Sequence, residues 1–363
     1  MILLIVLAYT YPALAAQIST YSQCDCGYSD PRTLATWSEM WHMNFEKNDG
    51  STATMQQQLY SDKELFFSSY IIDAKFNDSY PRVFKKENVR IHDESLEVRV
   101  TVDPTKSTPA ERIQCGGVGT DRQDFMYGSF RSYMRATKVN GTVAGMFAYN
   151  AQGEIDIELL SSLQPSEVYF AMHPGLIENG KASPLTHGNV QLGFDPTDDF
   201  HEYRFDWFPN LTVFYVDGVE SYRMTTNVLN LPSRVMFNHW TDGNANFSQG
   251  PATENASINI KNMTFFFNST DIKSAPICLT SRAACDIQQI ISALQNDSQQ
   301  APTTSSGNNS NGTGDTMLDP FEKTKDTSTS GIAMIGKQDL LSCYWIYTLL
   351  LTSIWLVFTP YIL

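Results

Sequence analysis

Three acidic residues alternate with apolar residues in one short stretch of the chain. Residues 153–160 have the sequence Gly-Glu-Ile-Asp-Ile-Glu-Leu-Leu. Successive side chains of a β-strand point to opposite faces, so Glu154, Asp156 and Glu158 would share one face. The Ile and Leu residues between them would be buried from the other face. The stretch therefore predicts a core strand with three carboxylates aligned on its exposed side.

The spacing of the two glutamates suits the cleavage of glycosidic bonds. Glu154 and Glu158 are four residues apart, roughly 13 Å between Cα atoms at ~3.3 Å per residue. Their side chains can lean together and bring the carboxyl groups to about 5–6 Å, the separation of a retaining glycosidase. One glutamate would attack the anomeric carbon, and the other would protonate the leaving oxygen and later activate water. Asp156, between them, would raise a neighbouring pKa and share a proton with the nucleophile.

A half-exposed strand with solvated charges would show the same alternation. Acids at positions i, i+2 and i+4 arise by chance roughly 0.4 times in an acidic chain of this length. Like charges on one strand face destabilise a sheet, which favours a functional role. The spacing alone does not decide between an active site and a charged surface.

Alternation with a period of two also marks the elements that must position these acids. Tyr203, Phe205 and Trp207 alternate with charged residues, and Asp217-Gly218 predicts a tight hairpin turn between two apolar runs. Further strands are predicted at residues 94–102, 211–216, 219–222 and 258–267, and a helix at residues 286–295. Many strands with few helices predict an all-β fold, an antiparallel β-sandwich.

Further motifs surround the acidic stretch, in order, between about residues 120 and 270. They are Tyr127-Gly128-Ser129-Phe130 with Met134 and Arg135, Gly145-Met146-Phe147-Ala148-Tyr149, Phe200-His201-Glu202-Tyr203-Arg204-Phe205-Asp206-Trp207, Tyr215-Val216-Asp217-Gly218-Val219, and Met236-Phe237-Asn238-His239-Trp240. Together with Glu-Ile-Asp-Ile-Glu they resemble glycoside hydrolase family 16, a group of β-glucanases and cell-wall transglycosylases. The resemblance implies a jelly-roll sandwich of the concanavalin A-like lectin and glucanase type.

The resemblance also implies roles for single residues. Glu154 would be the nucleophile, Asp156 the assisting carboxylate and Glu158 the general acid/base. The expected substrate-binding residues are Trp240 as a stacking platform for a sugar ring, Asn238 as a hydrogen-bonding partner beside it, Phe147 and Tyr149 as packing or floor residues, and His173. The loop after Trp240 favours exposure of its ring. Gln152-Gly153, where many relatives have Trp or Asp, indicates a different cleft wall.

No metal ion and no cofactor is expected, because the carboxylates alone can carry the reaction. His173, His201 and His239 are scattered without ligand spacing, which favours structural roles over metal ligation. Residues 259–262 are Asn-Ile-Lys-Asn, and they lack the acidic residue that the resemblance would require for a structural calcium ion.

Both ends of the chain resemble targeting signals. Residues 1–16 are apolar and end near the small-x-small pattern Ala13-Leu14-Ala15, which predicts a cleaved secretory signal peptide. The segment from Leu340 to Leu363 contains no charged residue and follows a polar spacer and the small residues 328–331. This order is typical of a glycosylphosphatidylinositol (GPI) anchor signal, and a stop-transfer helix is the alternative.

The rest of the chain then divides into two parts. We expect one catalytic domain at residues 17–290 and a flexible, glycosylated stalk rich in Ser, Thr and Asn at residues 291–331, before a removed tail at residues 332–363. Ten Asn-x-Ser/Thr sequons support export, at Asn77, Asn140, Asn210, Asn246, Asn255, Asn262, Asn268, Asn296, Asn308 and Asn311. Of the cysteines, Cys278 and Cys285 are expected to form a local bridge. Cys115 is expected to tie the segment with Cys24 and Cys26 to the core.

The net charge of the chain is −14, from 39 acidic and 25 basic residues, which disfavours nucleic-acid binding. The expected function is a retaining endo-β-glucan hydrolase acting on β-1,3- or β-1,3/1,4-glucan. The protein would be a secreted monomer, anchored by GPI to the outer plasma membrane or cell wall of a walled, fungal cell. Two alternatives remain open: a transglycosylase with the same catalytic residues, and a wall glucan-binding protein without catalysis.

Overall fold

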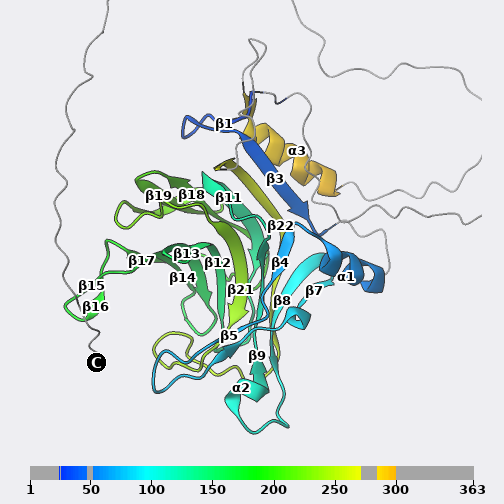
Figure 1. The fold of residues 1–363 in the computed structure, drawn as a ribbon, viewed down its shortest axis with the longest axis vertical. Helices are drawn as coiled ribbons and strands as arrows, with labels where there is room; N and C mark the ends of the chain where they lie inside the picture. The colour runs from blue at the N-terminus through cyan, green and yellow to red at the C-terminus, as the bar shows by residue number, and fades with distance from the viewer. Residues whose placement is uncertain (1–23, 25, 47–51, 271–283, 300–363) are drawn as a thin grey trace, which may run out of the picture. The chain divides into compact units, whose positions relative to one another are not determined.

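The computed structural model describes residue 24 and residues 26–46, 52–270 and 284–299 (Figure 1). The chain divides into two compact units, residues 1–303 and 304–363, and the second unit lies wholly outside the described residues. The predicted signal peptide, most of the predicted stalk and the predicted anchor signal also lie outside them. Within the described part of the chain, no helix is both long and apolar enough to cross a membrane.

One of the two large sheets has seven strands, all paired antiparallel. Their order across the sheet is β17 (His187–Gln191), β14 (Glu167–His173), β13 (Gly153–Leu160), β12 (Val143–Asn150), β21 (Arg234–Trp240), β10 (Gly116–Thr120) and β4 (Leu65–Phe67). The acidic stretch forms β13, near the centre of this sheet.

The other large sheet has nine strands and is also antiparallel. Its main path is β20 (Val219–Met224), β19 (Leu211–Val216), β18 (His201–Phe208), β11 (Phe125–Arg135), β22 (Ala256–Ser269), β8 (Ser95–Val102) and β7 (Val89–His92). In addition, β3 (Glu39–Asn44) pairs with β22, and β9 (Ile113–Gln114) pairs with β8.

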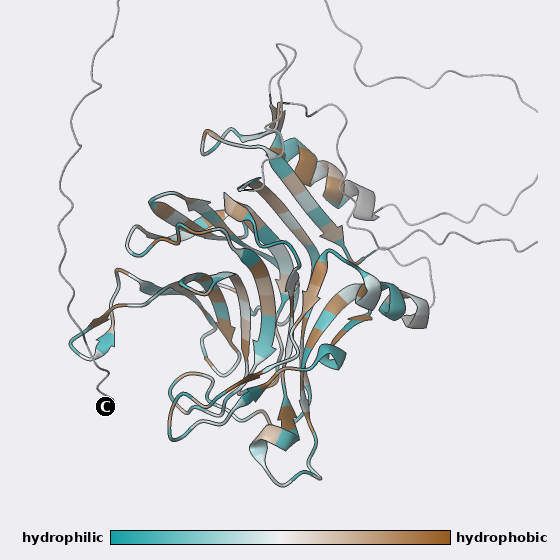
Figure 2. Ribbon diagram, in the orientation of Figure 1, coloured by the Kyte–Doolittle hydropathy of each residue, from teal (hydrophilic) through white to brown (hydrophobic). Residues whose placement is uncertain are grey.

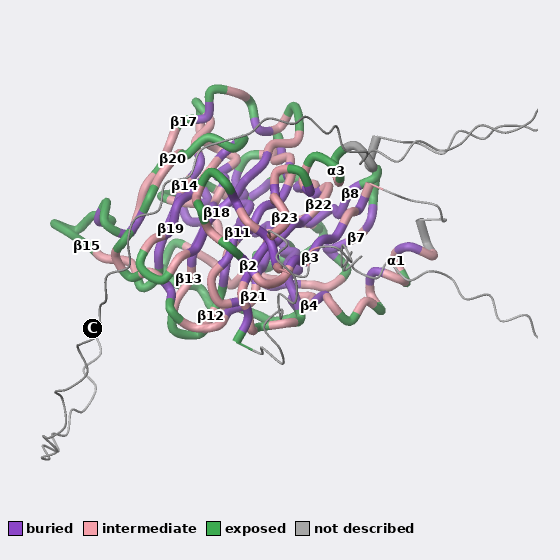
Figure 3. The backbone as a smooth tube through the Cα atoms, turned by 90° about the horizontal axis from the view of Figure 1, so that it is seen from above, coloured by how far each residue is buried: buried purple, intermediate pink, exposed green. Residues whose placement is uncertain are grey.

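The two sheets pack face to face around one apolar core. Phe170 of β14 and Phe214 of β19 stack across the sheets with ring centroids 4.7 Å apart. Figure 2 shows apolar and polar residues alternating along the strands, and Figure 3 shows buried residues concentrated in the strands of both sheets. The structure thus confirms the predicted all-β, antiparallel sandwich. It also confirms the predicted hairpin turn, because Asp217 and Gly218 have φ angles of 48° and 75°.

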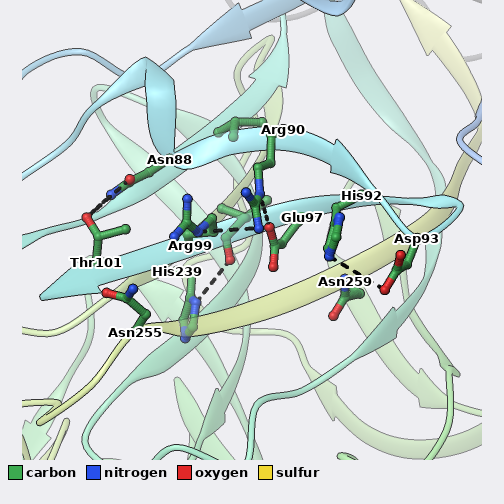
Figure 4. A network of polar contacts seen from close by, with 12 residues as sticks. Asn88, Arg90, His92, Asp93, Glu97, Arg99, Thr101, His239, Asn255 and Asn259 are labelled. Carbon is green, nitrogen blue, oxygen red and sulfur yellow. Dashed lines mark hydrogen bonds and ion pairs between the residues drawn. The ribbon is translucent and has the colours of Figure 1, made fainter. Parts of the chain in front are cut away.

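Smaller elements complete the fold. They are α1 (Thr52–Ser61), β5 (Ile71–Ile72) paired with β6 (Arg82–Val83), the 3₁₀ helix η1 (Lys86–Asn88), α2 (Pro109–Arg112), and β15 (Ile177–Glu178) paired with β16 (Lys181–Ala182). On the edge of the nine-stranded sheet, Glu97 of β8 contacts both Arg90 of β7 and Arg99 (Figure 4). The short hairpin that contains β6 matters for function, because Arg82 reaches the site described below.

An additional layer covers part of the nine-stranded sheet. It consists of β1 (Tyr28–Asp30), β2 (Ala35–Trp37), β23 (Cys285–Asp286) and α3 (Ile287–Gln299). The side chains of Ile287 and Ile290 pack with Phe266 of β22 in one buried cluster. Beneath the layer Arg204 is buried, and its Nη2 lies 3.6 Å from Asp30 Oδ2. The predicted domain end at residue 290 is therefore too early, since it falls inside α3.

The disulfide pattern differs from the expected one. Cys24 is bonded to Cys285, which closes the additional layer across 261 residues of sequence. Cys285 is thus not available for the local bridge predicted with Cys278, a residue outside the described part. Cys115 is buried with a free thiol, so the prediction that it ties the N-terminal segment to the core is wrong. Cys26 is also disulfide-bonded.

Candidate active site

The three predicted carboxylates share one face of β13. Ile155 and Ile157 are buried in the core between the sheets, as the alternation predicted. Glu154, Asp156 and Glu158 therefore project from the opposite side of the seven-stranded sheet, which we call the acidic face. Asp156 is only 6% exposed, and its two neighbours are partly exposed.

Strand register decides which side chains surround the acids, because directly opposite residues in an antiparallel pair project to the same face. On β12 the residues opposite Glu154, Asp156 and Glu158 are Tyr149, Phe147 and Gly145. On β14 they are His173, Ala171 and Tyr169. The structure thus brings three of the predicted substrate-binding residues, Phe147, Tyr149 and His173, next to the carboxylates.

The environment of the three acids raises the pKa of each to a different extent. Burial, followed by the charges of Glu154 and Glu158, raises the pKa of Asp156 well above its usual range. Asp156 and Glu154 are joined by a hydrogen bond, which favours a protonated Asp156 as donor. Burial also raises the pKa of Glu154, whereas the bond from Asp156 and the charge of Arg82 lower it. Asp156 therefore stabilises a negative charge on Glu154.

Glu158 behaves as a weak acid near neutral pH. Burial and then the charge of Glu154 raise the pKa of Glu158 to about 7, while the charge of Arg82 lowers it. A carboxyl group with this pKa still holds its proton in mildly acidic solution, as a general acid must. Two carboxylates whose environments separate their pKa values are the usual arrangement of an acid and a nucleophile at one site.

Asn238 lies on β21, two strands from Glu158, with β12 between them. Gly145 separates the two residues in register, opposite Glu158 on one side and Asn238 on the other. A Cβ atom at Gly145 would lie 2.6 Å from Asn238 Oδ1, so only glycine leaves room for this side chain. Among the described groups, Asn238 Oδ1 is buried without a hydrogen-bond partner. It is thus available to a hydroxyl group of a ligand.

Trp240 is buried, with only 6% of its surface exposed, although the loop that follows it suggested exposure. The Arg82 guanidinium carbon lies 4.4 Å from the centroid of the Trp240 ring, and Phe247 stacks on the ring at 6.1 Å. A sugar could stack on Trp240 only if Arg82 moved, so the role of Trp240 as a platform stays a prediction. Tyr149, by contrast, is 46% exposed on the acidic face.

The three histidines occupy different environments. His239 is fully buried, with Nδ1 3.1 Å from Val98 O and Nε2 2.8 Å from Thr142 Oγ1, as expected of a structural residue. His201 Nδ1 lies 2.8 Å from Asp217 Oδ2 at the hairpin turn. Only His173 belongs to the site, with Nε2 3.4 Å from Asp156 Oδ2.

Arg82 is a residue of the site that sequence inspection missed. It comes from the hairpin of β5 and β6, and its charge acts on both Glu154 and Glu158. No motif marks it, since a lone arginine after Tyr80-Pro81 carries no pattern. Only the fold reveals its role, by placing it over Trp240.

A cavity of about 230 Å³ lies at the far end of β12 and β13 and is separate from these acids. Its lining includes Lys138, Leu160 and Asp195 and none of the three carboxylates. The chemistry of the chain is therefore assigned to the acidic face, where three neighbouring carboxyl groups all have raised pKa values.

Comparisons with known proteins agree with this geometry. Over 122 residues the chain is 38% identical to a β-glucanase of Acetivibrio thermocellus, covering 32% of this chain and 34% of the relative. Over 154 residues it is 28% identical to the probable xyloglucan endotransglucosylase/hydrolase protein 27 of Arabidopsis thaliana, covering 40% and 43%. The chain spans between 20% and 56% of the length of the curated relatives it matches.

Solved structures share the fold. The laminarinase catalytic domain from Thermotoga maritima MSB8 aligns with a TM-score of 0.50 at 16% identity, covering 62% of this chain and 96% of that chain. The model of "Glycosyl hydrolases family 16" matches residues 76–260, a range that contains the acidic stretch, Arg82 and Trp240. The chain belongs to glycosyl hydrolase family 16.

Proposed function

We propose that the protein is a retaining endo-β-glucan hydrolase that acts on β-1,3- or β-1,3/1,4-glucan of a cell wall. The observation that carries the proposal is the division of proton affinity on β13. Glu158 has a pKa of about 7, and Asp156 hydrogen-bonds to Glu154. A double displacement requires a protonated acid, here Glu158, and a stabilised carboxylate, here Glu154.

In the first step, Glu154 attacks the anomeric carbon while Glu158 donates its proton to the glycosidic oxygen, which leaves as a hydroxyl. The products of this step are a glycosyl ester on Glu154 and a carboxylate on Glu158. In the second step, Glu158 takes a proton from water, and the water oxygen displaces Glu154 from the sugar. Asp156 donates its hydrogen bond to Glu154 whenever Glu154 carries the negative charge. Asn238 is positioned to hold a sugar hydroxyl.

A transglycosylase is the second candidate, because one of the matched relatives carries that activity in its name. The same four groups would serve it, with a sugar hydroxyl in place of water in the second step. Exclusion of water and binding of an acceptor distinguish the two activities, and neither is encoded by the carboxylates themselves.

Sizing of reaction products tests the proposal and separates the candidates. The purified protein is incubated with defined oligosaccharides of β-1,3-glucan, β-1,3/1,4-glucan and xyloglucan, and products are sized by mass spectrometry. Shorter products alone support hydrolysis, whereas products longer than the donor support transfer. Wild-type protein that cleaves and transfers none of them but binds a glucan would instead be a binding protein. The first-formed product must keep the β-anomeric configuration in proton NMR, since inversion would contradict the mechanism.

We further propose that the protein is exported and held at the cell surface by a GPI anchor. The apolar ends of the chain and the ten sequons support this location. Release of the protein from intact cells by a phosphatidylinositol-specific phospholipase would agree with the anchor. Retention after complete digestion would favour the stop-transfer helix.

A further inference from the structure

The acidic face contains a set of potential metal-donor atoms, two of them on carboxylates of the proposed reaction and one on His173. Asp156 Oδ2 is buried and, among the described groups, has no hydrogen-bond partner. His173 Nε2 lies 3.4 Å from this oxygen. One oxygen of Glu154, one oxygen of Asp156 and one ring nitrogen of His173 all lie within 4.8 Å of one another. Two carboxylates and an imidazole thus converge on one point.

The position of His173 is fixed by its surroundings. It is the last residue of β14 and lies directly opposite Glu154 in register. The ring of His187 meets its ring edge to face, with centroids 5.9 Å apart. His187 Nδ1 in turn lies 3.1 Å from Thr186 Oγ1. A Cβ atom at Gly175 would lie 2.4 Å from the His187 ring, so glycine leaves the space for this support.

One nitrogen and two carboxylate oxygens form a donor set typical of Zn²⁺ and of the neighbouring divalent transition metals. The imidazole of histidine is the commonest side-chain ligand of such ions and binds through a ring-nitrogen lone pair. Ligand atoms at ~2.0–2.2 Å from a tetrahedral ion lie ~3.3–3.6 Å apart, as Asp156 Oδ2 and His173 Nε2 already do. A small rotation of Glu154 would complete the set. Mg²⁺ and Ca²⁺ prefer six or more oxygen ligands and fit poorly.

We propose that Glu154, Asp156 and His173 bind a divalent transition-metal ion, represented by Zn²⁺, and that the bound ion inhibits the enzyme. Binding would release the proton of Asp156 to solvent, because a ligating carboxylate is deprotonated. The ion would occupy the oxygen of Glu154 that attacks the sugar and would keep the substrate out of the site. The inhibition rests on the proposed function, whereas the binding of the ion does not.

Titration calorimetry with zinc chloride tests the binding. Untagged wild-type protein is expected to bind one ion at this site, and His173→Phe should weaken the binding at least tenfold. His92→Phe is the matched control, because His92 Nε2 forms a similar pair with Asp93, at 3.5 Å, on an exposed turn away from the site (Figure 4). Magnesium chloride at the same concentration should give no binding heat. Zinc binding that is unchanged by His173→Phe would overturn the proposal.

Kinetics with a β-glucan test the consequence. Zinc should raise the apparent KM in proportion to its concentration and leave kcat unchanged, and a chelator should reverse the effect. Activation by zinc, or inhibition that is equal in wild type and His173→Phe, would contradict the proposed inhibition. Zinc binding that depends on His173 in a protein without glucanase activity would retain the metal site and remove the proposed function. Glucanase activity without zinc binding would retain the proposed function and remove the metal site.

Discussion

Arg82 covers Trp240 with its guanidinium group, at 4.4 Å from the ring centroid, and from that position its charge also reaches both glutamates of β13. The cation–π contact holds the arginine over the acidic face. One side chain from a two-residue strand thus links a buried aromatic residue to the two groups that would exchange protons and form a covalent bond. This relationship predicts how the activity depends on pH.

Replacing Arg82 should move the pH profile of the activity to higher pH. The activity requires ionised Glu154 and protonated Glu158, and the positive charge lowers the pKa of both. In Arg82→Gln both pKa values in the profile of kcat/KM against pH should therefore increase, by a few tenths of a unit to about one unit. Arg234→Gln is the control, since Arg234 lies over Phe66 on the same sheet at 4.3 Å. A profile of Arg82→Gln that coincides with that of the control would refute the electrostatic role.

Removal of the acid Glu158 should slow a substrate more when its leaving group is less acidic and so depends more on protonation. Glu158→Ala is expected to reduce kcat on a β-glucan by about 10²–10⁴-fold, because the leaving hydroxyl must be protonated. An aryl β-glucoside oligosaccharide with an acidic phenol should lose far less in the first step and release a burst of phenol. Equal losses on both substrates, measured by stopped-flow absorbance, would argue against Glu158 as the acid. Glu154→Gln should give no burst on either substrate.

The raised pKa of Glu158 also predicts a dependence of stability on pH. Its value is 4.5 in an ordinary environment and about 7 in the folded protein, so the folded state holds the proton more tightly. The free energy of unfolding should therefore fall as pH rises from about 4.5 to 7. Glu158→Gln removes this loss, so the variant should be more stable than wild type at pH 7.5, by about 1–3 kcal/mol, and similar at pH 4. Urea unfolding at both pH values measures the difference, and equal stability at pH 7.5 would contradict it.

Local geometry explains why part of the site could be predicted from the sequence. The alternation of Glu154, Asp156 and Glu158 with apolar residues depends only on the two-residue period of a strand, and it was confirmed by the burial of Ile155 and Ile157. The turn at residues 217–218 is local in the same sense. Such features need no knowledge of which strands are neighbours.

Features that depend on long-range pairing could not be predicted. The resemblance placed His173 among the site residues, but its contact with Asp156 depends on the register of β14 against β13. Trp240 is buried because Arg82 and Phe247 cover its ring. The bond between Cys24 and Cys285 spans 261 residues, and cysteine spacing carries no information on such a pairing.

The Cys24–Cys285 disulfide should hold the additional layer on the nine-stranded sheet. The bond closes a loop of 261 residues of sequence separation, and the layer contributes only a small buried cluster that includes Tyr28 and Ile287. The double variant Cys24→Ala/Cys285→Ala should lose stability by about 2–5 kcal/mol. Hydrogen exchange should show that amides of α3 lose protection before those of β13. Cys115→Ala, which removes a buried free thiol elsewhere, is the control and should leave the exchange of α3 unchanged. Full protection of α3 in the double variant would contradict this role of the Cys24–Cys285 bond.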